Sequence, residues 1–483
     1  MQNGVVEAFV KKVDMLVFAP HFYTMQGEGV GYRANQAMAV DGGRIEALLH
    51  REEALQAYSA EEVLDLAHHI VLPGLIDAHM HTGSNVVRGV AQDTRNWMMY
   101  GIQPFSLAQG KADYDAGSKV GMLEAIKAGT TTLGDYQQDM DQRCAFIAKI
   151  GVRGHIAHTI RSAEKRVYDP GECYTFIEEM GRRSLQENLD LYDRWNGYDG
   201  GRIQVLFGPQ GADFVSPDLL HEIWRLANER HTRVHMHTQQ GSRETAQTQM
   251  RYGMRPVQWL GQQGLLNERL IAVHLTDCTA DEARMVARSG ACMVVCPGSI
   301  GLIDGQVPPS LPFQQAGGCV ALGSDQSPGN NCHNIFNEMK LVALFNKIKQ
   351  QDPEVMPAWR ALRMATIEGA QAIGLGEKIG SLEVGKRADF IAVNTMTPSM
   401  LPVLTHPMRN MVPNLVYSAR GCEVDLSAVD GRVIMRHQKV LGVNEWELME
   451  SMNAHAQQVA ERATQAFLDI HGTNATMMEK NQL

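Results

Sequence analysis

The sequence predicts an α/β fold: a (β/α)8 barrel of the TIM type, with a small composite β-sandwich domain formed by both termini. Two observations carry this prediction. From Leu72 to Asp325, short apolar runs alternate with amphipathic stretches of about 10 to 20 residues. The flanking segments, residues 1–73 and 380–442, instead alternate polar and apolar residues over short distances, as half-buried strands do. Eight apolar runs with helices between them fit a barrel of about 250 residues or more.

The eight apolar runs are the expected barrel strands. Helix-like segments lie between them, such as residues 279–290, and several end in the glycine that stops helices. Another helical stretch, residues 357–374, follows the eighth run. In chain order, the expected strands are residues 71–81, 130–136, 152–159, 203–209, 232–238, 270–276, 292–297 and 319–325.

The two ends of the chain share the same pattern of alternating segments and Asp-Gly turns. An Asp-Gly turn at Asp41-Gly42 lies between two alternating segments, as a hairpin connection does, and a second one occurs at Asp430-Gly431. Near the second turn, residues 388–394, 414–419 and 428–442 are β-like. We therefore expect residues 1–73 and 380–442 to form one β-sandwich, residues 74–379 the barrel, and residues 443–483 a C-terminal helix and tail.

Composition and charge exclude several classes of protein. Hydrophobic residues make up 44% and charged residues 20%, which excludes wholesale disorder, and a net charge of −10 gives no footprint for nucleic acid. No run of about 18 apolar residues predicts a membrane span, and the N-terminus lacks the features of a signal peptide. The eight cysteines include no C-x-x-C pair and are typical of reduced thiols, so we expect a cytoplasmic protein.

Chemistry-bearing side chains gather where the expected strands end. The tripeptide His-Met-His occurs twice, so that His79 and His81 end the first strand and His237 ends the fifth. His274 ends the sixth strand and Asp325 ends the eighth. In such a barrel the active site lies at these C-terminal strand ends. Imidazoles and a carboxylate suit a divalent cation such as Zn²⁺, which lowers the pKa of a bound water and so provides a hydroxide nucleophile.

Each of these residues also has a structural interpretation. A histidine in a strand is more often a hydrogen-bonded core residue than a ligand, and Asp325 by itself is also typical of a helix N-cap. His155 and His158, in the third strand, are assigned to the core or to the pocket lining. The joint occurrence of five such residues at strand ends favours a metal site over these single interpretations.

Seven motifs resemble the amidohydrolase superfamily: "LPGLIDAHMH", "KAGTTTLGDY", "VHMHT", "IAVHLT", "VVCPGSIGL", "ALGSDQSPGNN" and "IGSLEVGKRADFIAVN". The similarity is greatest to the branch that holds guanine and S-adenosylhomocysteine deaminases and triazine hydrolases, and it extends from about residue 36 to residue 442. It implies a barrel flanked by a composite β-sandwich. It also implies one metal per chain, because the fourth strand does not end in the lysine of binuclear members.

The resemblance also implies roles for individual residues. His79, His81, His237 and Asp325 would bind the metal, zinc first, with iron, cobalt or manganese as alternatives. His274 would orient or polarise the substrate, and Asp325 would serve additionally as the base that takes a proton from the nucleophilic water. His235 is assigned to the core or to a position behind the ligands. A homodimer or larger homo-oligomer is expected from the family alone.

Two departures from the family pattern bear on the reaction. Relatives carry a glutamate three residues after the fifth-strand histidine, where this chain has Gln240, and an amide does not titrate. After the fourth strand, the usual Pro-His-Ala-Pro-Tyr is replaced by a segment that includes Gln210 and Asp213. These losses leave attack of a metal-bound hydroxide on a carbonyl as a route. The loss of the glutamate is similar to that in hydrolases resembling phenylurea hydrolase and molinate hydrolase, which implies hydrolysis of a C–N or C–S bond in a urea, carbamate, thiocarbamate or amide, such as a phenylurea or a thiocarbamate. Asp213 or His158 would otherwise have to replace the missing acid.

Two other functions remain open. One is an aminohydrolase or chlorohydrolase of an N-heterocycle such as a triazine, pterin or purine, which must operate without the glutamate. The other is a non-catalytic barrel with a structural metal, which the expected open coordination position disfavours. Either enzyme would act on a small molecule, and its pocket would be lined by amide, aromatic and charged side chains. The expected substrate-binding residues are Asn85, Arg88, Trp97, Gln210, Asp213, Gln240 and Asn331.

Overall fold

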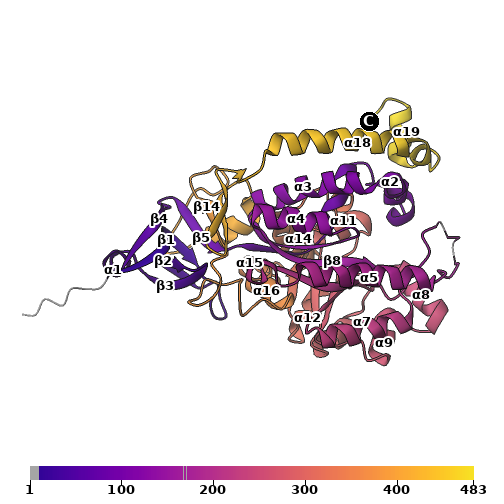
Figure 1. Ribbon diagram of the computed structural model, residues 1–483, viewed down its shortest axis with the longest axis horizontal. Coiled ribbons are helices and arrows are strands. Elements are labelled where there is room, and N and C mark those ends of the chain that lie inside the picture. Colours follow the sequence, from indigo (N-terminus) through magenta and orange to yellow (C-terminus); the bar gives the residue numbers. More distant parts are fainter. Residues whose placement is uncertain (1–9, 167, 170) are drawn as a thin grey trace, which may run out of the picture.

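The computed structural model describes residues 10–166, 168–169 and 171–483, so that residues 1–9 of the expected N-terminal part lie outside the described residues. Figure 1 shows an elongated molecule with a β-sheet at one end and a helix-covered barrel at the other. Strands from the first and last thirds of the chain lie together in that sheet. The predicted α/β fold, with a barrel and a composite β domain, is confirmed.

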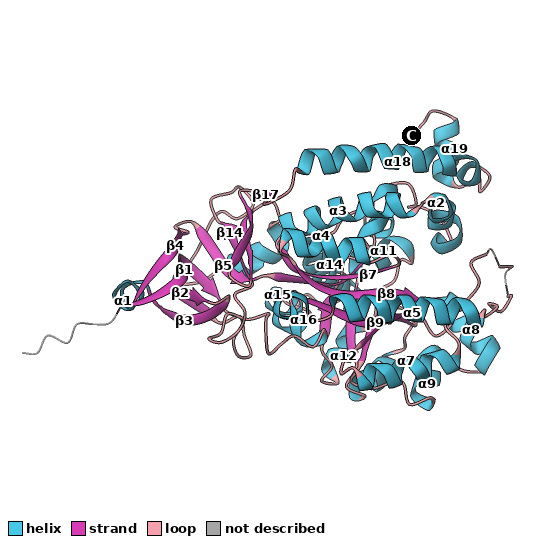
Figure 2. Cartoon of the chain, in the orientation of Figure 1, coloured by secondary structure: helices cyan, strands magenta, loops and turns pink. Residues whose placement is uncertain are grey.

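All eight predicted barrel strands are present. They form a parallel sheet in which each strand pairs with its neighbours in sequence (Figure 2). A bridge between Met80 and Asp325 joins the first strand to the end of the last, because the Asp325 N–H donates to the His79 carbonyl at 2.9 Å. The strands are β6 (Leu75–Met80), β7 (Thr130–Gln137), β8 (Arg153–Ile160), β9 (Ile203–Pro209), β10 (Val234–Thr238), β11 (Leu270–His274), β12 (Cys292–Val295) and β13 (Val320–Leu322).

The first predicted strand, residues 71–81, is in fact two strands of different sheets. β5 (His69–Pro73) pairs with β14 (Phe390–Asn394) in the composite sheet, whereas β6 pairs with β7 in the barrel. Gly74 lies between them, and a Cβ atom there would approach Thr131 Oγ1 to 2.0 Å. The absence of a side chain therefore lets the backbone pass from one sheet to the other against the neighbouring strand.

The composite sheet is mixed and has nine strands. Its strands enclose a common apolar core that includes Val17, Met38, Val71, Phe390 and Leu426. The sheet runs β17-β16-β15-β14-β5-β1-β2-β3, with β4 paired to β1. The strands not yet given are β1 (Lys11–Tyr23), β2 (Tyr32–Asp41), β3 (Arg44–His50), β4 (Tyr58–Asp65), β15 (Val424–Val429), β16 (Arg432–Arg436) and β17 (Lys439–Val440).

Both Asp-Gly turns are hairpin connections, as predicted, and they meet in space. Asp41 pairs with Arg44 across the first turn, and Val429 pairs with Arg432 across the second. The Ala388 N–H donates to the Gly43 carbonyl at 3.0 Å, and the Ala388 carbonyl accepts from the Gly431 N–H at 3.0 Å. One residue of the C-terminal part thus holds together turns that are almost 400 residues apart in the sequence.

One β-like segment was assigned wrongly from the sequence. Residues 414–419 are not a strand: Asn414–Ser418 (η3) is a π-helical turn that continues α17 (Met411–Pro413). Leu415 and Val416 are fully buried in the core of the barrel domain. A short apolar run of this length fits a buried helical turn as well as a strand.

Helices cover the outside of the barrel, as expected of the segments between its strands (Figure 1). Residues 357–374 contain two helices where one was predicted, with a break at Thr366. The helices are α1 (Arg51–Ala57), α2 (Gln103–Ala108), α3 (Lys111–Lys127), α4 (Asp141–Ile150), α5 (Glu178–Trp195), α6 (Tyr198–Gly201), α7 (Pro217–Glu229), α8 (Ser242–Tyr252), α9 (Pro256–Gln262), α10 (Ala280–Arg288), α11 (Pro297–Ile303), α12 (Ser310–Gln315), α13 (Ser327–Asn330), α14 (Ile335–Gln350), α15 (Ala358–Met364) and α16 (Ile367–Ala372).

The C-terminal segment lies over the loop that follows the first barrel strand. Helix α18 (Glu445–Leu468) runs along α3, and α19 (Thr473–Glu479) follows it (Figure 1). Val459 and Ala463 of α18 are buried against apolar side chains of residues 86–105, including Trp97. This loop also contains the 3-10 helix η1 (Thr82–Val87) and the π-helical η2 (Trp97–Ile102). The tail therefore fixes a segment that borders the C-terminal strand ends.

We propose domain limits at residues 1–73, 74–379, 380–442 and 443–483, which the change of sheet at Gly74 supports. A buried ion pair joins the barrel to the C-terminal part of the composite domain, since Arg153 of β8 donates to Asp389 at 2.7 and 2.9 Å and to Asp430 at 2.7 Å. Within the described ranges, every helix is too short or too polar to cross a bilayer.

Candidate active site

The strand ends bring the five predicted metal-site residues together. One possible ligand atom from each of His79, His81 and His237 lies within 4.8 Å of the others, and the same holds for His79, His274 and Asp325. The His79 ring centroid lies 4.7, 4.9 and 5.5 Å from the centroids of His81, His237 and His274. All five side chains are buried except that of His81, which is partly exposed. The clustering that the motif order predicted is present.

His235 holds the ring of His79. The two imidazoles lie with Nδ1 of His79 2.9 Å from Nε2 of His235, deep in the barrel. This contact occupies one nitrogen of His79 and leaves Nε2 for the centre of the cluster. The second His-Met-His thus contributes one residue to the cluster and one residue behind it, and buried partners of this kind typically fix the orientation of metal-binding histidines.

Backbone carbonyls hold the other two imidazoles. Nδ1 of His81 contacts the Tyr136 carbonyl at the end of β7, and Nδ1 of His237 lies 3.0 Å from the Gln210 carbonyl after β9. A carbonyl accepts only, so both rings carry their proton on Nδ1. Their Nε2 atoms, 3.4 Å apart, are therefore unprotonated and have lone pairs facing the cluster.

Asp325 completes the cluster from β13. Its Oδ2 accepts from the Ser299 hydroxyl at 2.6 Å, while Oδ1 lies 3.5 Å from His81 Nε2 and 3.7 Å from His79 Nε2. Its backbone has φ of +59°, an uncommon conformation for a residue with a side chain. Asp325 is not the N-cap of the next helix, because that position belongs to Gln326.

The donor set fits a divalent cation. His79 Nε2 and Asp325 Oδ1 are buried and have no hydrogen-bond partner among the described residues. Buried polar atoms are nearly always paired, so two unpartnered atoms side by side, each able to offer a lone pair, fit a cation held between them. Three imidazole nitrogens and one carboxylate oxygen, each held from behind, are a ligand set typical of zinc.

His274 differs from its neighbours. Neither of its ring nitrogens has a partner within the described ranges, and its backbone has φ of +78°. Burial lowers the pKa of His274 to about 4, so the ring is neutral at pH 7. A neutral, uncommitted imidazole beside the cluster is available to a substrate, and it also belongs to the donor group of His79 and Asp325.

Burial sets the charge of the cluster. It lowers the pKa values of His79 and His237 far below the ordinary value, and neighbouring imidazoles lower them further. Burial also raises the pKa of Asp325, but His274, His81 and the Ser299 hydroxyl outweigh it, so the net shift is downward. At pH 7 His79 and His237 are thus neutral beside the Asp325 carboxylate, which is the protonation state that a cation requires of them.

Comparison with known proteins gives the family. Residues 70–434 match the amidohydrolase family. The chain belongs to that family. A 5-methylthioadenosine/S-adenosylhomocysteine deaminase from Desulforudis audaxviator is 30% identical over 88% of this chain and 95% of that protein. A 5'-deoxyadenosine deaminase from Methanobrevibacter smithii is 28% identical over 83% and 89%.

Solved structures agree with this assignment. An adenosine deaminase from Xanthomonas campestris with bound zinc has a TM-score of 0.84 and 26% identity, covering 94% of this chain and 100% of that one. An atrazine chlorohydrolase from Arthrobacter aurescens complexed with zinc has a TM-score of 0.80 over 92% and 100%, and at 19% identity it shows the fold alone. The amidohydrolase described here is thus a metal-dependent hydrolase of carbon–nitrogen bonds other than peptide bonds, as predicted.

The two glutamines of the amidohydrolase's altered motifs lie at neighbouring strand ends. Gln240 is half-buried, and its backbone N–H donates to Glu244 Oε2 at 2.9 Å. Gln210 supplies the carbonyl that holds His237, and its side-chain oxygen accepts from Arg161 at 3.3 Å. Burial, and then the charge of Asp213, raises the pKa of Glu244 to about 8. A buried acid therefore lies directly behind Gln240, although the side chain at position 240 itself cannot titrate.

Asp213 is placed less favourably for substrate binding than its sequence position implied. Its side chain is fully buried and forms an ion pair with Arg243. The Phe214 ring lies between the guanidinium groups of Arg161 and Arg243, at 4.5 and 4.6 Å from its centroid. Asp213 thus neutralises the partly buried charge of Arg243. His158, the other candidate acid, lies 3.2 Å from Glu187 and faces helix α5.

Several of the predicted substrate-binding residues lie in the loop after β6. They contact one another and the loop after β13. Asn85 and Ser327 are hydrogen-bonded, and Arg88 forms an ion pair with Glu124 of α3. Asn331 accepts from Gln92 Nε2 at 2.7 Å and has φ of +63°. These contacts join the first and last strand loops of the barrel, so the residues border the site chiefly as its framework.

Trp97 begins η2 and is 4% exposed. Its ring packs in the apolar cluster beneath α18, and its Nε1 has no partner in the part of the chain that the structure describes. The sequence placed Trp97 in the pocket because it follows the first strand, and no local pattern indicates the C-terminal helix that covers it.

Two further groups of the site were missed by sequence reasoning. Ser299 holds Asp325, and the quoted "VVCPGSIGL" motif contains it without marking its role. Behind the ligands, the Ser324 hydroxyl lies 2.5 Å from Asp77 Oδ2 and 2.8 Å from His333 Nδ1. These buried hydrogen bonds link β6 to the end of β13, where the first and last strands of the barrel meet. No spacing pattern in the sequence indicates them.

His333 is expected to make stability depend on pH. Burial, followed by the charge of Arg88, lowers its pKa to about 3, whereas an unfolded histidine titrates near 6.5. Below pH 6.5 the unfolded chain takes up a proton that the folded chain refuses, so this contribution to stability falls as pH falls toward 3. His333→Gln should reduce the slope of unfolding free energy against pH by up to ~1.4 kcal/mol per pH unit well below pH 6.5, and by about half of that at pH 6.5, where the unfolded histidine is half protonated.

Denaturant unfolding at several pH values between 5.5 and 7.5 measures this slope. The exposed His221 is the control position, and His221→Gln should leave the slope as in the wild type. A His333→Gln protein with the wild-type slope would contradict the assignment.

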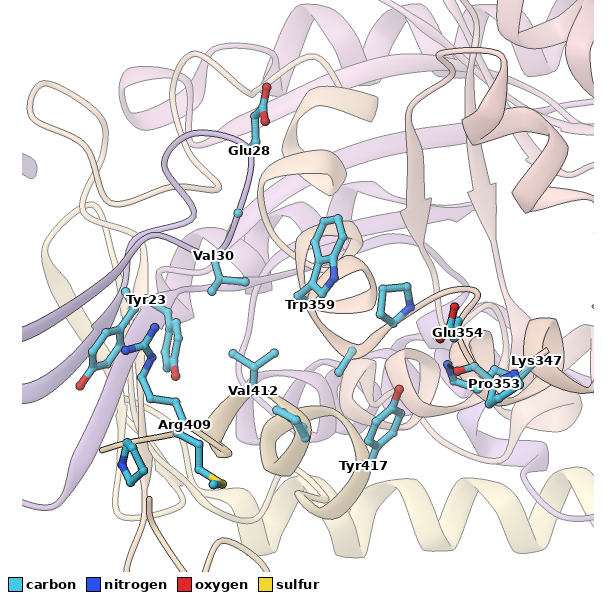
Figure 3. A pocket seen from close by; sticks show the side chains of 17 residues that line it. Tyr23, Glu28, Val30, Lys347, Pro353, Glu354, Trp359, Arg409, Val412 and Tyr417 are labelled. Carbon is cyan, nitrogen blue, oxygen red and sulfur yellow. Dashed lines mark hydrogen bonds between the residues drawn. The ribbon is translucent and has the colours of Figure 1, made fainter. Parts of the chain in front are cut away.

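A separate cavity of about 1110 Å³ lies away from the metal cluster. Figure 3 shows Tyr23, Val30, Trp359, Arg409 and Tyr417 around it. It is formed by the β1–β2 loop, the α14–α15 connection and residues 407–417, and none of the predicted site residues lines it. This cavity is therefore separate from the proposed chemistry.

Proposed function

We propose that this amidohydrolase removes the exocyclic amino group of an adenosine-type N-heterocycle. The observation that carries the proposal is the similarity to adenosine-type deaminases along most of the chain, 30% identical over 88% of it. The sequence alone placed ureas and thiocarbamates first, on the strength of Gln240, and heterocycles second. The comparisons support the second choice more than the first, and the cluster suits both.

We further propose His79, His81, His237 and Asp325 as ligands of one divalent metal, zinc first. When bound, such a cation supplies a water of lowered pKa and hence a nucleophile at neutral pH. Asp325 Oδ1 is the carboxylate atom placed to take the proton from that nucleophile, while Ser299 keeps Oδ2 occupied. His274, with its uncommitted ring nitrogens, holds the substrate atom on which charge develops.

Gln240 cannot supply the proton that the heterocycle needs during deamination, because an amide does not titrate. We assign the return of the proton to Asp325, the carboxylate that lies among the ligands. The Gln240 side chain then holds a ring nitrogen or a carbonyl by hydrogen bonding alone.

Gln240 also favours a second candidate function. An amide at this position suits a substrate that needs no ring protonation, because attack on a urea, carbamate or thiocarbamate carbonyl requires only that the leaving amine or thiol be protonated. A single carboxylate that first accepts and then returns a proton meets this requirement.

A substrate panel distinguishes the two candidates. It contains 5'-deoxyadenosine, 5'-methylthioadenosine, S-adenosylhomocysteine, guanine, a pterin and an amino-triazine, together with phenylureas and thiocarbamates. Ammonia is measured in parallel with aniline, amine or thiol release. Ammonia from a heterocycle supports deamination, whereas amine or thiol release without ammonia from any heterocycle overturns it and supports the second function. Metal analysis of the same sample tests the expected one zinc per chain.

Gln240→Glu is the most direct variant for this choice. Because it restores a titratable group at the position where deaminases of this branch carry one, we expect the protein to fold and ammonia release to rise about tenfold or more. Gln249→Glu, on the exposed side of α8, is the matched control and should change nothing. If ammonia release is unchanged or falls in Gln240→Glu, proton delivery does not pass through position 240.

We also infer a cytoplasmic location and a homo-oligomer, both carried over from the sequence. All eight cysteines are free, which supports a reducing compartment. Light scattering of the purified protein measures the oligomeric state.

A further inference from the structure

Two cysteines lie side by side at the end of the barrel opposite the metal cluster. Cys292 is the first residue of β12, and Cys319 immediately precedes β13. The strands are parallel neighbours with Met293 opposite Val320, and the Met293 N–H donates to the Cys319 carbonyl at 3.0 Å. Cys292 and Cys319 therefore occupy matching positions on adjacent strands, at a spacing that a disulfide can bridge.

The two thiols lie at the edge of an apolar cluster, and Arg233 brings a positive charge to them. Arg233, just before β10, donates to the Ala372 carbonyl at 2.7 Å and approaches Cys292 Sγ to 3.6 Å with the same nitrogen. Within the described ranges, no carboxylate forms an ion pair with Arg233, so its charge is available to a thiolate. The Cys319 thiol lies 3.1 Å from the Glu368 carbonyl and also contacts Cys292.

Glu368 and His155, the other titratable groups near Arg233 and the two thiols, do not destabilise a thiolate on Cys292. The Glu368 carboxylate is neutralised by Arg360 and Arg363, at 2.8 and 3.3 Å. His155 of β8, which faces Arg233, is neutral at pH 7 because burial lowers its pKa to about 3. Cys292 is 7% exposed and Cys319 is half-buried, so the pair lies near the surface without being openly exposed.

We propose that Cys292 and Cys319 form a dithiol that hydroperoxides oxidise to a disulfide, with Cys292 as the attacking thiolate and Cys319 as the resolving thiol. Cys292 sulfur attacks one peroxide oxygen: the S–O bond forms, the O–O bond breaks, and the leaving oxygen takes a proton. Cys319 sulfur then attacks the sulfenic sulfur, the S–S bond forms, and hydroxide leaves with the Cys319 proton as water. With hydrogen peroxide, two thiols become one disulfide and two molecules of water.

The acidity of the thiols agrees with this order of events. The hydrogen bond from Cys319, followed by Arg233, lowers the pKa of Cys292 to about 6, although burial opposes the shift. In contrast, burial raises the pKa values of Cys144, Cys278 and Cys296. Since the thiolate is the reactive form, Cys292 should react in preference to those buried thiols.

Peptide mapping of the metal-loaded, full-length protein after limiting hydrogen peroxide tests the proposal. We expect a Cys292–Cys319 disulfide to form before the exposed Cys173 and Cys422 lose their thiols. Alkylation of Cys292 should be half-maximal near pH 6. Earlier oxidation of Cys173 or Cys422, or a Cys292 that forms no disulfide with Cys319, overturns the proposal.

A pair of substitutions at one position separates the two roles of Cys319. Cys319→Ser keeps a hydrogen-bond donor but removes the resolving sulfur, so a sulfenic acid should accumulate on Cys292 and be trapped by dimedone. Cys319→Ala removes both, and the same trapping should be at least about tenfold slower, because the thiolate loses its donor. Equal trapping rates in the two variants would show that Cys319 does not activate Cys292. The wild-type mapping remains decisive if either variant fails to fold.

Discussion

Replacing Asp325 with asparagine should abolish turnover while leaving the barrel folded. Asp325 is the only carboxylate of the cluster within the described residues, and its unpartnered Oδ1 lies 3.5 and 3.7 Å from two imidazole nitrogens. The substitution removes one proposed metal ligand and the proposed proton acceptor together, and an amide replaces neither. We expect kcat to fall by about 10³-fold or more, because loss of general-base catalysis alone costs about 10² to 10⁴-fold.

Activity is compared with metal content and thermal unfolding measured on the same sample. Asp281→Asn is the matched control, because the Asp281 side chain is 94% exposed in the first turn of α10, where it pairs with Arg284. That variant should keep its metal and its activity. Wild-type turnover in a folded Asp325→Asn enzyme would remove Asp325 from both proposed roles.

The fold and the clustering of the proposed ligands were predictable because their signals are local. Strand alternation, helix-stopping glycines and two Asp-Gly turns each occupy a few consecutive residues, and the barrel then brings every strand end to one face. His79, His237 and Asp325 could therefore be placed together without knowledge of any contact. The split at Gly74 was missed because an apolar run does not reveal which sheet it joins.

The partners of the ligands were less predictable because they depend on side chains from distant strands. His235 contacts His79 across 156 residues, and Ser299 reaches Asp325 from a different loop. The sequence could place His235 behind the ligands by its two-residue spacing, but not identify its partner. Arg88 was assigned to substrate by position, whereas the structure pairs it with Glu124. Long polar side chains on loops have many possible partners, and only tertiary structure selects one.

His274→Ala should leave the metal bound and remove most of the activity. Both nitrogens of His274 are free of hydrogen bonds to the described residues, whereas His79, His81 and His237 each have one nitrogen held from behind. Ligand histidines are usually held in this way, so the missing support separates His274 from the proposed ligands. Loss of a single group that stabilises developing charge costs about 10² to 10³-fold in kcat, and we expect a fall of this size.

Metal analysis decides between the two roles that the geometry allows for His274. It shares a donor group with His79 and Asp325, so a His274→Ala protein that is folded but has lost its metal would make it a ligand instead. Removing a fully buried ring also leaves a cavity, so thermal unfolding must accompany the assay. His221→Ala, at an exposed position of α7, supplies the control that should match the wild type in metal, activity and stability. Retained metal together with lost turnover would assign His274 to the substrate, because a neutral imidazole with both nitrogens uncommitted has no other partner in the site.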